Sequence, residues 1–191
     1  MSTKTYQIHV ELKGSKPRIW RRLLVPADVE LSDLHKILQT AMGWTNSHMH
    51  HFAKDRNFYE PPQPADDLWD SMGEDYTGLT LQKFLSKRNE KLTYEYDFGD
   101  GWEHTIKLEK IVKKDPDIDL PICTEGEMAC PPEDCGGIWG YQELKKALNN
   151  PEHPEHEYYM EWLGNDFDPE EFSVIFVNEM LREEDYGVIG F

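Results

Sequence analysis

"YEYDFGDGWEHTI", residues 94–106, alternates aromatic with polar side chains on either side of a Gly-Asp-Gly turn. A period of two is typical of a strand with one buried face, so this stretch predicts an antiparallel strand pair. Residues that face each other across such a pair lie on the same side of the sheet. Phe98 is therefore expected opposite Trp102, and Tyr96 opposite His104.

The same register predicts a three-residue loop, residues 99–101, and puts Asp97 opposite Glu103. Like charges that face each other across two strands are unfavourable unless a positive group lies close to them. Lys107, a basic side chain from elsewhere in the chain, or a metal ion could supply that charge. A neighbouring Lys or Arg is the simplest choice.

The first 43 residues predict two more strands and a helix. Residues 6–12 alternate cleanly, and residues 18–25 follow after a Gly-Ser-Lys-Pro turn, most simply as an antiparallel partner. Leu34 to Met42 then carry apolar residues at helical spacing. Ser32 is the expected N-cap and Gly43 the expected C-terminal stop of that helix.

The remaining elements alternate short strands with loops and end in helices. Residues 48–59 predict a short strand pair, residues 60–78 a long loop rich in Pro, Gly and acids, and residues 80–85 a short helix. Residues 140–182 predict a helical C-terminal part. Strand pairs first and helices last indicate an α+β fold with a mostly antiparallel sheet, and we expect residues 1–191 to form one domain.

The last predicted helix begins at Asp168-Pro169-Glu170-Glu171, which combines an Asp cap, a Pro at the first position and acids in the first turn. Helical spacing then predicts four inward-facing residues. They are Phe172, Ile175, Phe176 and Met180.

The composition indicates a globular, soluble and cytoplasmic protein. Of 191 residues, 38% are hydrophobic, and the longest apolar runs are far shorter than the roughly 20 residues of a membrane span. The N-terminus lacks the apolar core of a signal peptide. Cys123, Cys130 and Cys135 are therefore expected to be reduced.

The formal net charge of −17 is unevenly distributed. Residues 1–60 carry 9 basic and 6 acidic side chains, whereas residues 151–191 carry 12 acids and Arg182 alone. A small basic cluster predicts a solvated edge facing the acidic helices, so direct binding of nucleic acid is not expected. Its members are Lys16, Arg18, Arg21 and Arg22.

His48 and His50 would point to the same face of a strand, as two ligands of one metal ion do. Zinc or another divalent metal needs three or four converging ligands, so the pair alone does not define a site. The cysteines are one further source of ligands. The acids and imidazole around the hairpin turn are another: Asp97, Asp100, Glu103 and His104.

"CTEGEMACPPEDCGG", residues 123–137, predicts a stiff, sharply turning loop that carries Glu133 and Asp134. Its Cys spacings are not those of a zinc ribbon or a redox pair, which favours buried, unreactive thiols. The chain contains no P-loop, dinucleotide fingerprint or nucleophile elbow. The "DFG" at residues 97–99 lacks the other kinase motifs.

Six motifs, in this order, resemble the plasmid pRiA4b ORF-3-like family: RIWRRLLVP, LHKILQTAMGW, HMHHF, YEYDFGDGWEHTIKLEKI, CPPEDCGGIWGY and FDPEEF. They span Tyr6 to about Leu181. The resemblance implies one compact α+β domain, found in bacteria and archaea and sometimes associated with mobile elements, and it implies no activity. The family's polar positions correspond here to His48, His50, Asp97, Asp100, His104, Glu133 and Asp134.

These observations lead first to a ligand-binding or protein-interaction module whose working surface lies between the hairpin and the Pro-Pro-Glu-Asp loop. The expected ligand-binding residues are Asp97, Asp100, Trp102, Glu103, Glu133 and Asp134.

One alternative is a metal-dependent hydrolase in which His48, His50 and Asp97 or Asp100 hold the ion, and Glu133 or Asp134 acts as the base toward bound water. A second alternative is that the acidic C-terminal helices mimic nucleic acid or bind a basic protein partner.

Overall fold

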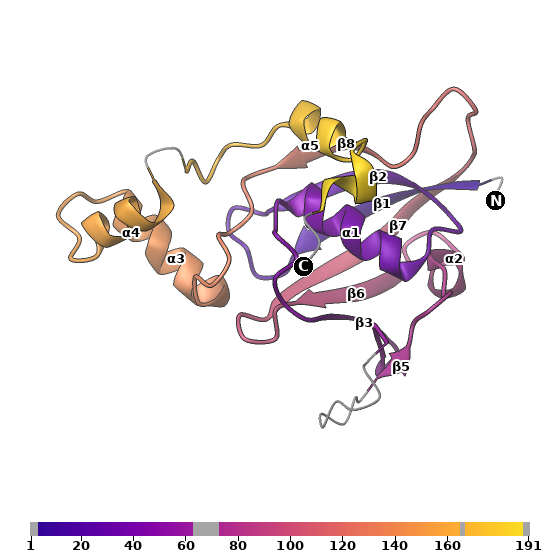
Figure 1. Ribbon diagram of the computed structural model, residues 1–191, viewed down its shortest axis with the longest axis horizontal. Helices are drawn as coiled ribbons and strands as arrows, with labels where there is room; N and C mark the ends of the chain where they lie inside the picture. Colours follow the sequence, from indigo (N-terminus) through magenta and orange to yellow (C-terminus); the bar gives the residue numbers. More distant parts are fainter. Residues whose placement is uncertain (1–3, 63–72, 165–166, 189–191) are drawn as a thin grey trace.

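The structure is a computed structural model that describes residues 4–62, 73–164 and 167–188. Within these residues eight strands form one sheet (Figure 1). They are β1 (Lys4–Leu12), β2 (Trp20–Pro26), β3 (His50–Lys54), β4 (Asn57–Glu60), β5 (Glu74–Asp75), β6 (Lys91–Tyr96), β7 (Trp102–Lys113) and β8 (Ile122–Glu127). Their order is β5-β4-β3-β6-β7-β1-β2-β8, and every neighbouring pair except β4 and β5 is antiparallel.

Five α-helices accompany the sheet in the described part of the chain: α1 (Leu31–Met42), α2 (Leu81–Phe84), α3 (Gly137–Leu148), α4 (His156–Leu163) and α5 (Val174–Met180). A short 3-10 turn, η1 (Glu184–Gly187), follows. Figure 1 shows α1 and α5 on one side of the sheet, whereas α3 and α4 project beyond its end as an arm. The predicted α+β fold with a mostly antiparallel sheet is confirmed.

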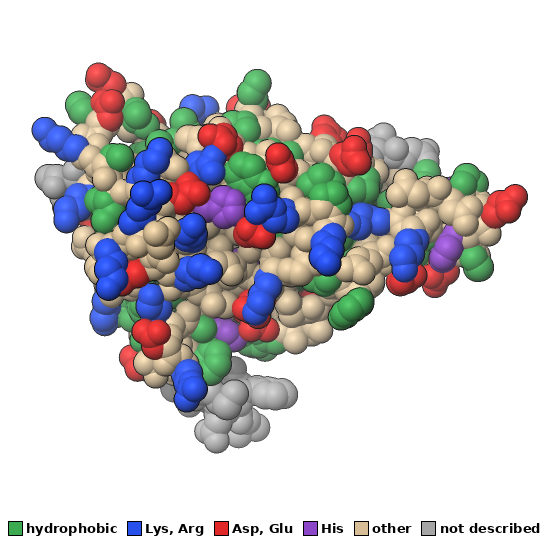
Figure 2. Space-filling model, turned by 180° about the vertical axis from the view of Figure 1, so that it is seen from behind, with side chains coloured by type: hydrophobic (Ala, Val, Ile, Leu, Met, Phe, Trp, Pro, Cys, Tyr) green, Lys and Arg blue, Asp and Glu red, His purple; other side chains and the backbone are tan. Residues whose placement is uncertain are grey.

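The two faces of the sheet differ as the sequence alternation predicts. On β1, the buried hydrophobic residues are Tyr6, Ile8, Val10 and Leu12, which lie on the helix-covered face. The other face carries polar side chains, and Figure 2 shows Lys and Arg spread across it with acids between them. Several of these charges are paired, as Arg22 is with Glu109. The basic and acidic residues therefore neutralise each other locally on this open face.

Helix α1 supplies most of the cover because one stripe of its surface is apolar. Leu31, Leu34, Ile37 and Leu38 are fully buried against the sheet. Gly43 ends the helix with a φ of +104°, and its N–H donates to the carbonyl of Gln39. The predicted helix is confirmed, but its N-cap is Glu30 and not Ser32, so it begins two residues earlier than predicted.

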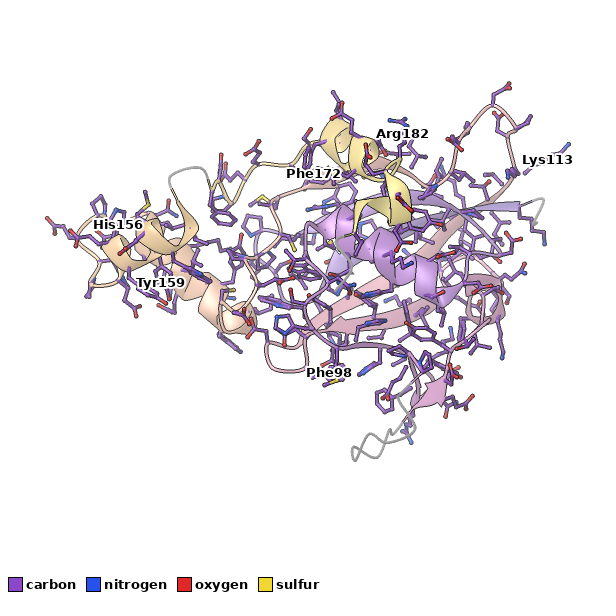
Figure 3. All side chains as sticks on the ribbon, viewed as in Figure 1. Phe98, Lys113, His156, Tyr159, Phe172 and Arg182 are labelled. Atoms are coloured by element: carbon purple, nitrogen blue, oxygen red, sulfur yellow. The ribbon has the colours of Figure 1, made fainter. Side chains whose placement is uncertain are left out.

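The hairpin of β6 and β7 forms, but its register differs from the prediction by two residues. Tyr96 pairs with Trp102 and Tyr94 with His104. Asp97 adopts a φ of +57°, which ends the strand, so the connection is longer than the predicted three residues. A shift of two preserves the face of every strand residue. Phe98, predicted in the strand, lies instead on the hairpin tip and is 44% exposed (Figure 3).

The C-terminal region differs most from the prediction. Asp168 caps a turn through its bond from the N–H of Glu170, and α5 begins only after Ser173, whose hydroxyl accepts from the N–H of Phe176. Ile175 and Phe176, predicted to face inward, are 73% and 61% exposed.

Two other stretches differ from the prediction. The strand β8, which pairs with β2, lies where only a loop was predicted. Of the predicted loop 60–78, residues 63–72 lie outside the described residues, while Tyr76 is buried.

The predicted basic cluster is divided between the two faces of the sheet. Arg21 is 1% exposed and lies on the helix-covered face, whereas Arg22 lies on the open face and pairs with Glu109. The alternation of β2 accounts for this, because neighbouring residues of a strand point to opposite sides. None of the described helices is long and apolar enough to cross a membrane.

Candidate functional site

Three candidate side chains meet between the hairpin tip and the Pro-Pro-Glu-Asp loop. The Nε2 atom of His48 lies 3.7 Å from Oδ2 of Asp97 and 3.5 Å from Oδ1 of Asp134. All three ligand atoms lie within 4.8 Å of one another. This is the group of histidine, cysteine and acidic residues in the described chain that could hold a metal ion.

Asp97 is held by the hairpin turn that it begins. Its Oδ1 accepts hydrogen bonds from the N–H groups of Gly99 and Asp100, at 2.9 and 3.3 Å. Its own N–H donates to the carbonyl of Met49, which ties the turn to the segment that carries His48. The other carboxylate oxygen, Oδ2, faces the imidazole of His48. Asp97 is thus buried and oriented, with one oxygen engaged and one directed at the site.

Asp134 belongs to a loop that is fastened to the same hairpin tip. The N–H of Gly136 donates to Oδ2 of Asp100 at 3.1 Å. Gly137 packs so closely that a Cβ atom there would lie 2.4 Å from the carbonyl oxygen of Asp100. The side chain of Asp134 itself is 74% exposed. The site is therefore closed by protein at Asp97 and open to solvent at Asp134.

His48 is positioned by the hydroxyl of Tyr96. That hydroxyl accepts from the N–H of Ser47 at 2.9 Å and donates to Oε1 of Glu133 at 2.8 Å. The rings of His48 and Tyr96 also meet edge to face, with centroids 5.8 Å apart. One tyrosine on β6 therefore links the histidine segment to the acidic loop.

Glu133 connects the acidic loop to Thr45 and Tyr96 through hydrogen bonds. Its Oε1 accepts from the N–H of Thr45, and its Oε2 accepts from the Thr45 hydroxyl, at 2.9 and 2.7 Å. Partial burial would raise the pKa of Glu133, but the bonds from Thr45 and Tyr96 outweigh it and hold that pKa below the usual value. A carboxylate with a lowered pKa and occupied oxygens is a poor general base. The geometry therefore does not favour the predicted catalytic role of Glu133.

The spacing of the three atoms suits an ion between them better than direct bonds. A charge-assisted N–H···O bond is about 2.7–2.9 Å long, well below the observed separations. Two ligand atoms about 2.1 Å from a tetrahedral ion are about 3.4 Å apart, close to those separations. In addition, Nε2 of His48 is shielded from solvent and has no hydrogen-bond partner among the described residues. Buried polar atoms without a partner are uncommon in proteins.

Three of the predicted site residues lie in the core instead. The imidazole of His50 stacks on that of His35 and its Nε2 bonds to the hydroxyl of Tyr76, so it does not join His48. His104 and Trp102 are both 0% exposed. Burial lowers the pKa of His104 to about 4, which leaves the ring neutral. A role for these three residues at a surface site does not fit their burial.

The acids Asp100 and Glu103 also lie outside the metal-ligand group. Asp100 accepts a bond from the N–H of Gly136, so it holds the loop in place. Glu103 lies on the open face of the sheet opposite Glu95. Lys13 bonds to Glu103 at 2.8 Å and His51 lies 3.3 Å from Glu95. The prediction that Asp97 faces Glu103 is therefore wrong, because Glu95 faces it instead, and Lys13 supplies the positive charge beside that pair.

The three cysteines are free thiols. Burial raises the pKa of Cys123 to about 11 and that of Cys135 to about 12, and it raises the pKa of Cys130 strongly as well. The thiol and not the thiolate therefore dominates at neutral pH, and thiolate is the form that binds metal or attacks. The expectation of unreactive thiols agrees with these environments.

Sequence reasoning did not identify His35, the actual partner of His50. Its signal is visible in retrospect, because His35 follows Leu34 within the apolar stripe of α1. A histidine inside such a stripe is buried by the helix packing and needs hydrogen-bond partners there. His35 finds them in the hydroxyl of Tyr94 and the side-chain carbonyl of Asn46.

Comparison with known proteins agrees with this fold. The family model described as "Plasmid pRiA4b ORF-3-like protein" matches residues 4–175. The chain is 40% identical over 171 residues to "Uncharacterized protein y4hQ" of Sinorhizobium fredii, covering 88% of this chain and 86% of that protein. It matches the crystal structure of MM3350, a protein of unknown function from Methanosarcina mazei Go1, with a TM-score of 0.80 and 35% identity over 90% of this chain and 96% of that one. The chain belongs to the plasmid pRiA4b ORF-3-like family, as its motifs predict.

Proposed function

We propose that this chain binds a divalent metal ion through Nε2 of His48, Oδ2 of Asp97 and Oδ1 of Asp134. One observation carries the proposal. The partnerless Nε2 of His48 lies 3.7 and 3.5 Å from two carboxylate oxygens, which is the spacing of ligands around an ion. The site lies on the surface between the hairpin and the Pro-Pro-Glu-Asp loop, so the ligand of the expected ligand-binding module is the ion.

The ligand types narrow the choice of metal. One imidazole and two carboxylates suit Zn²⁺, Mn²⁺ or Fe²⁺. Magnesium and calcium are usually held by oxygen atoms alone, and copper(I) prefers thiolates. The exposed side of the site, at Asp134, leaves room for water or a further ligand to complete the coordination.

Hydrolysis is the chemistry that such a centre supports. A metal ion acidifies a bound water and makes it a nucleophile near neutral pH. The oxygens of Glu133 are engaged by Thr45 and Tyr96, so they are not free to assist as a base. A hydrolase at this site would therefore rely on the ion itself, with Asp134 as the exposed carboxylate beside the bound water.

Metal analysis of untagged protein, purified without chelator, tests the proposal directly. We expect near-stoichiometric zinc, manganese or iron, and a melting temperature that falls when the metal is removed and recovers when it is restored. Absence of metal, together with an unchanged melting temperature after each of these ions is added, would overturn the proposal.

We propose as a second candidate function that helix α4, on the arm formed by α3 and α4, binds a basic segment of a partner protein. Helix α4 has no buried residue, and its Tyr158 and Trp162 are 63% and 41% exposed. Their rings stack with centroids 6.5 Å apart. The exposed Glu155 and Glu161 lie within one turn of Tyr158, so acids and aromatic faces alternate. Such a surface attracts Lys and Arg by charge and by cation–π contact.

Fluorescence anisotropy with a labelled oligoarginine peptide tests this second function. We expect salt-sensitive binding that Trp162→Ser weakens, while Trp139→Ser, which removes another exposed Trp of the arm, leaves it unchanged. Equal binding by the two variants, or none by the parent protein at low salt, would contradict it.

A further inference from the structure

Arg21 places a positive charge in the interior without a carboxylate beside it. It is 1% exposed, and no described acid forms an ion pair with it. The acidic groups that raise its pKa are the thiols of Cys130 and Cys123, and no carboxylate contributes. Burial lowers the pKa of Arg21 to about 10, so the guanidinium is still charged at neutral pH. A buried charge is costly unless it is paired or fully hydrogen-bonded.

The hydrogen bonds of Arg21 involve only two of the three nitrogens of its guanidinium group. The Nε–H donates to the carbonyl of Ala41 at 2.7 Å, and Nη1 donates to the carbonyls of Trp20 and Glu127 at 2.8 and 2.9 Å. The ring of Phe172 lies 3.8 Å from its Cζ. These contacts explain how the charge is tolerated. The second terminal nitrogen, Nη2, donates to no acceptor in the part of the chain that the structure describes.

Arg21 lines a pocket of about 550 Å³, a size typical of small-molecule sites. The pocket lies between the C-terminal end of α1 and the segment that leads into α5, near the Phe172 labelled in Figure 3. Its apolar wall is formed by three aromatic residues, Phe167, Phe172 and Phe176. Two carboxylates also line it, those of Asp168 and Glu171. Both acids are exposed, so they lie at the solvent side while the guanidinium lies inside.

We infer that this pocket binds a small zwitterion with an apolar side chain, of the aromatic or branched α-amino acid class. The carboxylate of the ligand would accept from Nη2 of Arg21, and its ammonium would face Asp168 and Glu171. The apolar side chain would pack on the phenylalanine rings. A simple anion would be repelled by the two carboxylates and by a chain of formal net charge −17. A zwitterion has no net charge, so it is not repelled in this way. The pocket shares no residue with the group of His48, Asp97 and Asp134.

Calorimetric titration with three matched probes tests the inference. L-phenylalanine carries both charges, L-phenylalaninamide lacks the carboxylate, and 3-phenylpropionate lacks the ammonium. We expect L-phenylalanine to bind at least about ten-fold more tightly than either analogue, because each analogue leaves a charged group of the pocket without its partner. No binding of L-phenylalanine at millimolar concentration, or equal binding of either analogue, would overturn the inference.

A pair of neighbouring variants locates the binding. Glu171→Gln should weaken the binding of L-phenylalanine about three-fold or more and should not weaken that of 3-phenylpropionate, since only L-phenylalanine carries an ammonium. Glu170→Gln is the matched control, because this exposed neighbour does not line the pocket. Arg21→Met should abolish binding, but it also removes three bonds of the fold. The probe series and the Glu171 variant therefore decide the outcome even if that protein does not fold. Equal affinities of the two glutamine variants would contradict the site.

Discussion

The imidazole rings of His35 and His50 lie face to face in the core, with centroids 3.4 Å apart and planes only 4° from parallel. His35 comes from α1 and His50 from the first residue of β3, so the stack joins the helix to the sheet. Each ring also bonds to a tyrosine hydroxyl, of Tyr94 and Tyr76 respectively. Two stacked imidazoles cannot both carry a positive charge without strong repulsion, and burial disfavours a charge on either ring. The contact therefore requires neutral rings.

Acid should destabilise the protein through this pair. Burial lowers the pKa of His35 to about 4 and that of His50 to about 2, below the 6.5 of an unfolded chain. Below pH 6.5 the histidines therefore bind protons in the unfolded state but stay neutral in the folded state. The stabilising contribution of the neutral rings is fully present above pH 6.5. It is lost as the pH falls, toward about 4 for His35 and toward about 2 for His50. Each histidine contributes at most about 1.4 kcal/mol per pH unit in this window. Urea unfolding between pH 7.5 and about pH 4.5 measures the slope.

The variant His50→Gln isolates this contribution. Its amide keeps a polar partner for Tyr76 but does not titrate, so the loss of stability between pH 6.5 and 4.5 should be smaller by about 1–2 kcal/mol. His153→Gln, at an exposed turn of the arm, is the control and should keep the parent slope. Identical slopes in all three proteins would show that the stacked pair does not govern the response to acid.

Most of the sheet could be predicted from the sequence because burial follows a local period. The alternation of β1 and of the hairpin strands assigns each residue to a face, and the structure agrees at Tyr94, Tyr96 and His104. Register is less local. A shift of two residues keeps every face, so the pattern alone cannot exclude it. The left-handed conformation of Asp97, which ends the strand, selects the observed register.

The candidate site was only partly predictable for a different reason. His48, Asp97 and Asp134 were each candidate residues, but they come from three separate segments, and only the folded chain brings them together. The sequence grouped His48 with His50 on the assumption of one continuous strand. In the structure β3 begins at His50, so His48 precedes the strand and its ring is free to turn toward Asp97. His50 follows the alternation of β3 into the core, where His35 meets it.

Removal of Asp134 should weaken metal binding without harming the fold. Its side chain is 74% exposed, and substitutions at such positions usually change stability by less than about 0.5 kcal/mol. Asp134→Asn should nevertheless lower the affinity for zinc or manganese by at least about ten-fold, because one charged ligand is lost. Competition with a fluorescent chelator measures this. Asp117→Asn, at another exposed loop position, is the control. Unchanged affinity in Asp134→Asn would remove Asp134 from the site.

Loss of the Glu133 carboxylate should affect both stability and metal affinity. Its oxygens accept two bonds from Thr45 and one from Tyr96. In Glu133→Gln the amide nitrogen cannot accept, so unfolding should become easier by about 1–2 kcal/mol. Metal affinity should fall about ten-fold, as it does when groups that orient ligands are removed, because Tyr96 and Thr45 hold the segment before His48.

The pH dependence separates the role of the Glu133 charge from that of its shape. The pKa of Glu133 is held below its usual 4.5, so its stabilising effect is present above that value and is lost as the pH falls below it. Parent and Glu133→Gln proteins should therefore converge in stability at low pH. Glu152→Gln, an exposed glutamate of the arm, should behave as the parent protein throughout. A constant difference at all pH values would mean that the charge is not what matters.

The close contact between Gly137 and the hairpin tip should be the most sensitive point of the site's framework. A Cβ atom at Gly137 would lie 2.4 Å from the carbonyl oxygen of Asp100, whereas a Cβ atom at Gly101 would meet nothing within 4 Å. The two glycines have nearly the same φ, +66° and +67°, so Ala imposes a similar backbone cost of about 1–2 kcal/mol on each. Gly137→Ala must in addition push the acidic loop away from the turn that carries Asp97. Because overpacking costs about 1–3 kcal/mol, we expect Gly137→Ala to be less stable than Gly101→Ala by more than about 1 kcal/mol. We also expect Gly137→Ala to bind metal more weakly. Urea unfolding and chelator competition on both variants check this, and equal behaviour of the two would show that the loop and the hairpin tip are not held together as the structure has them.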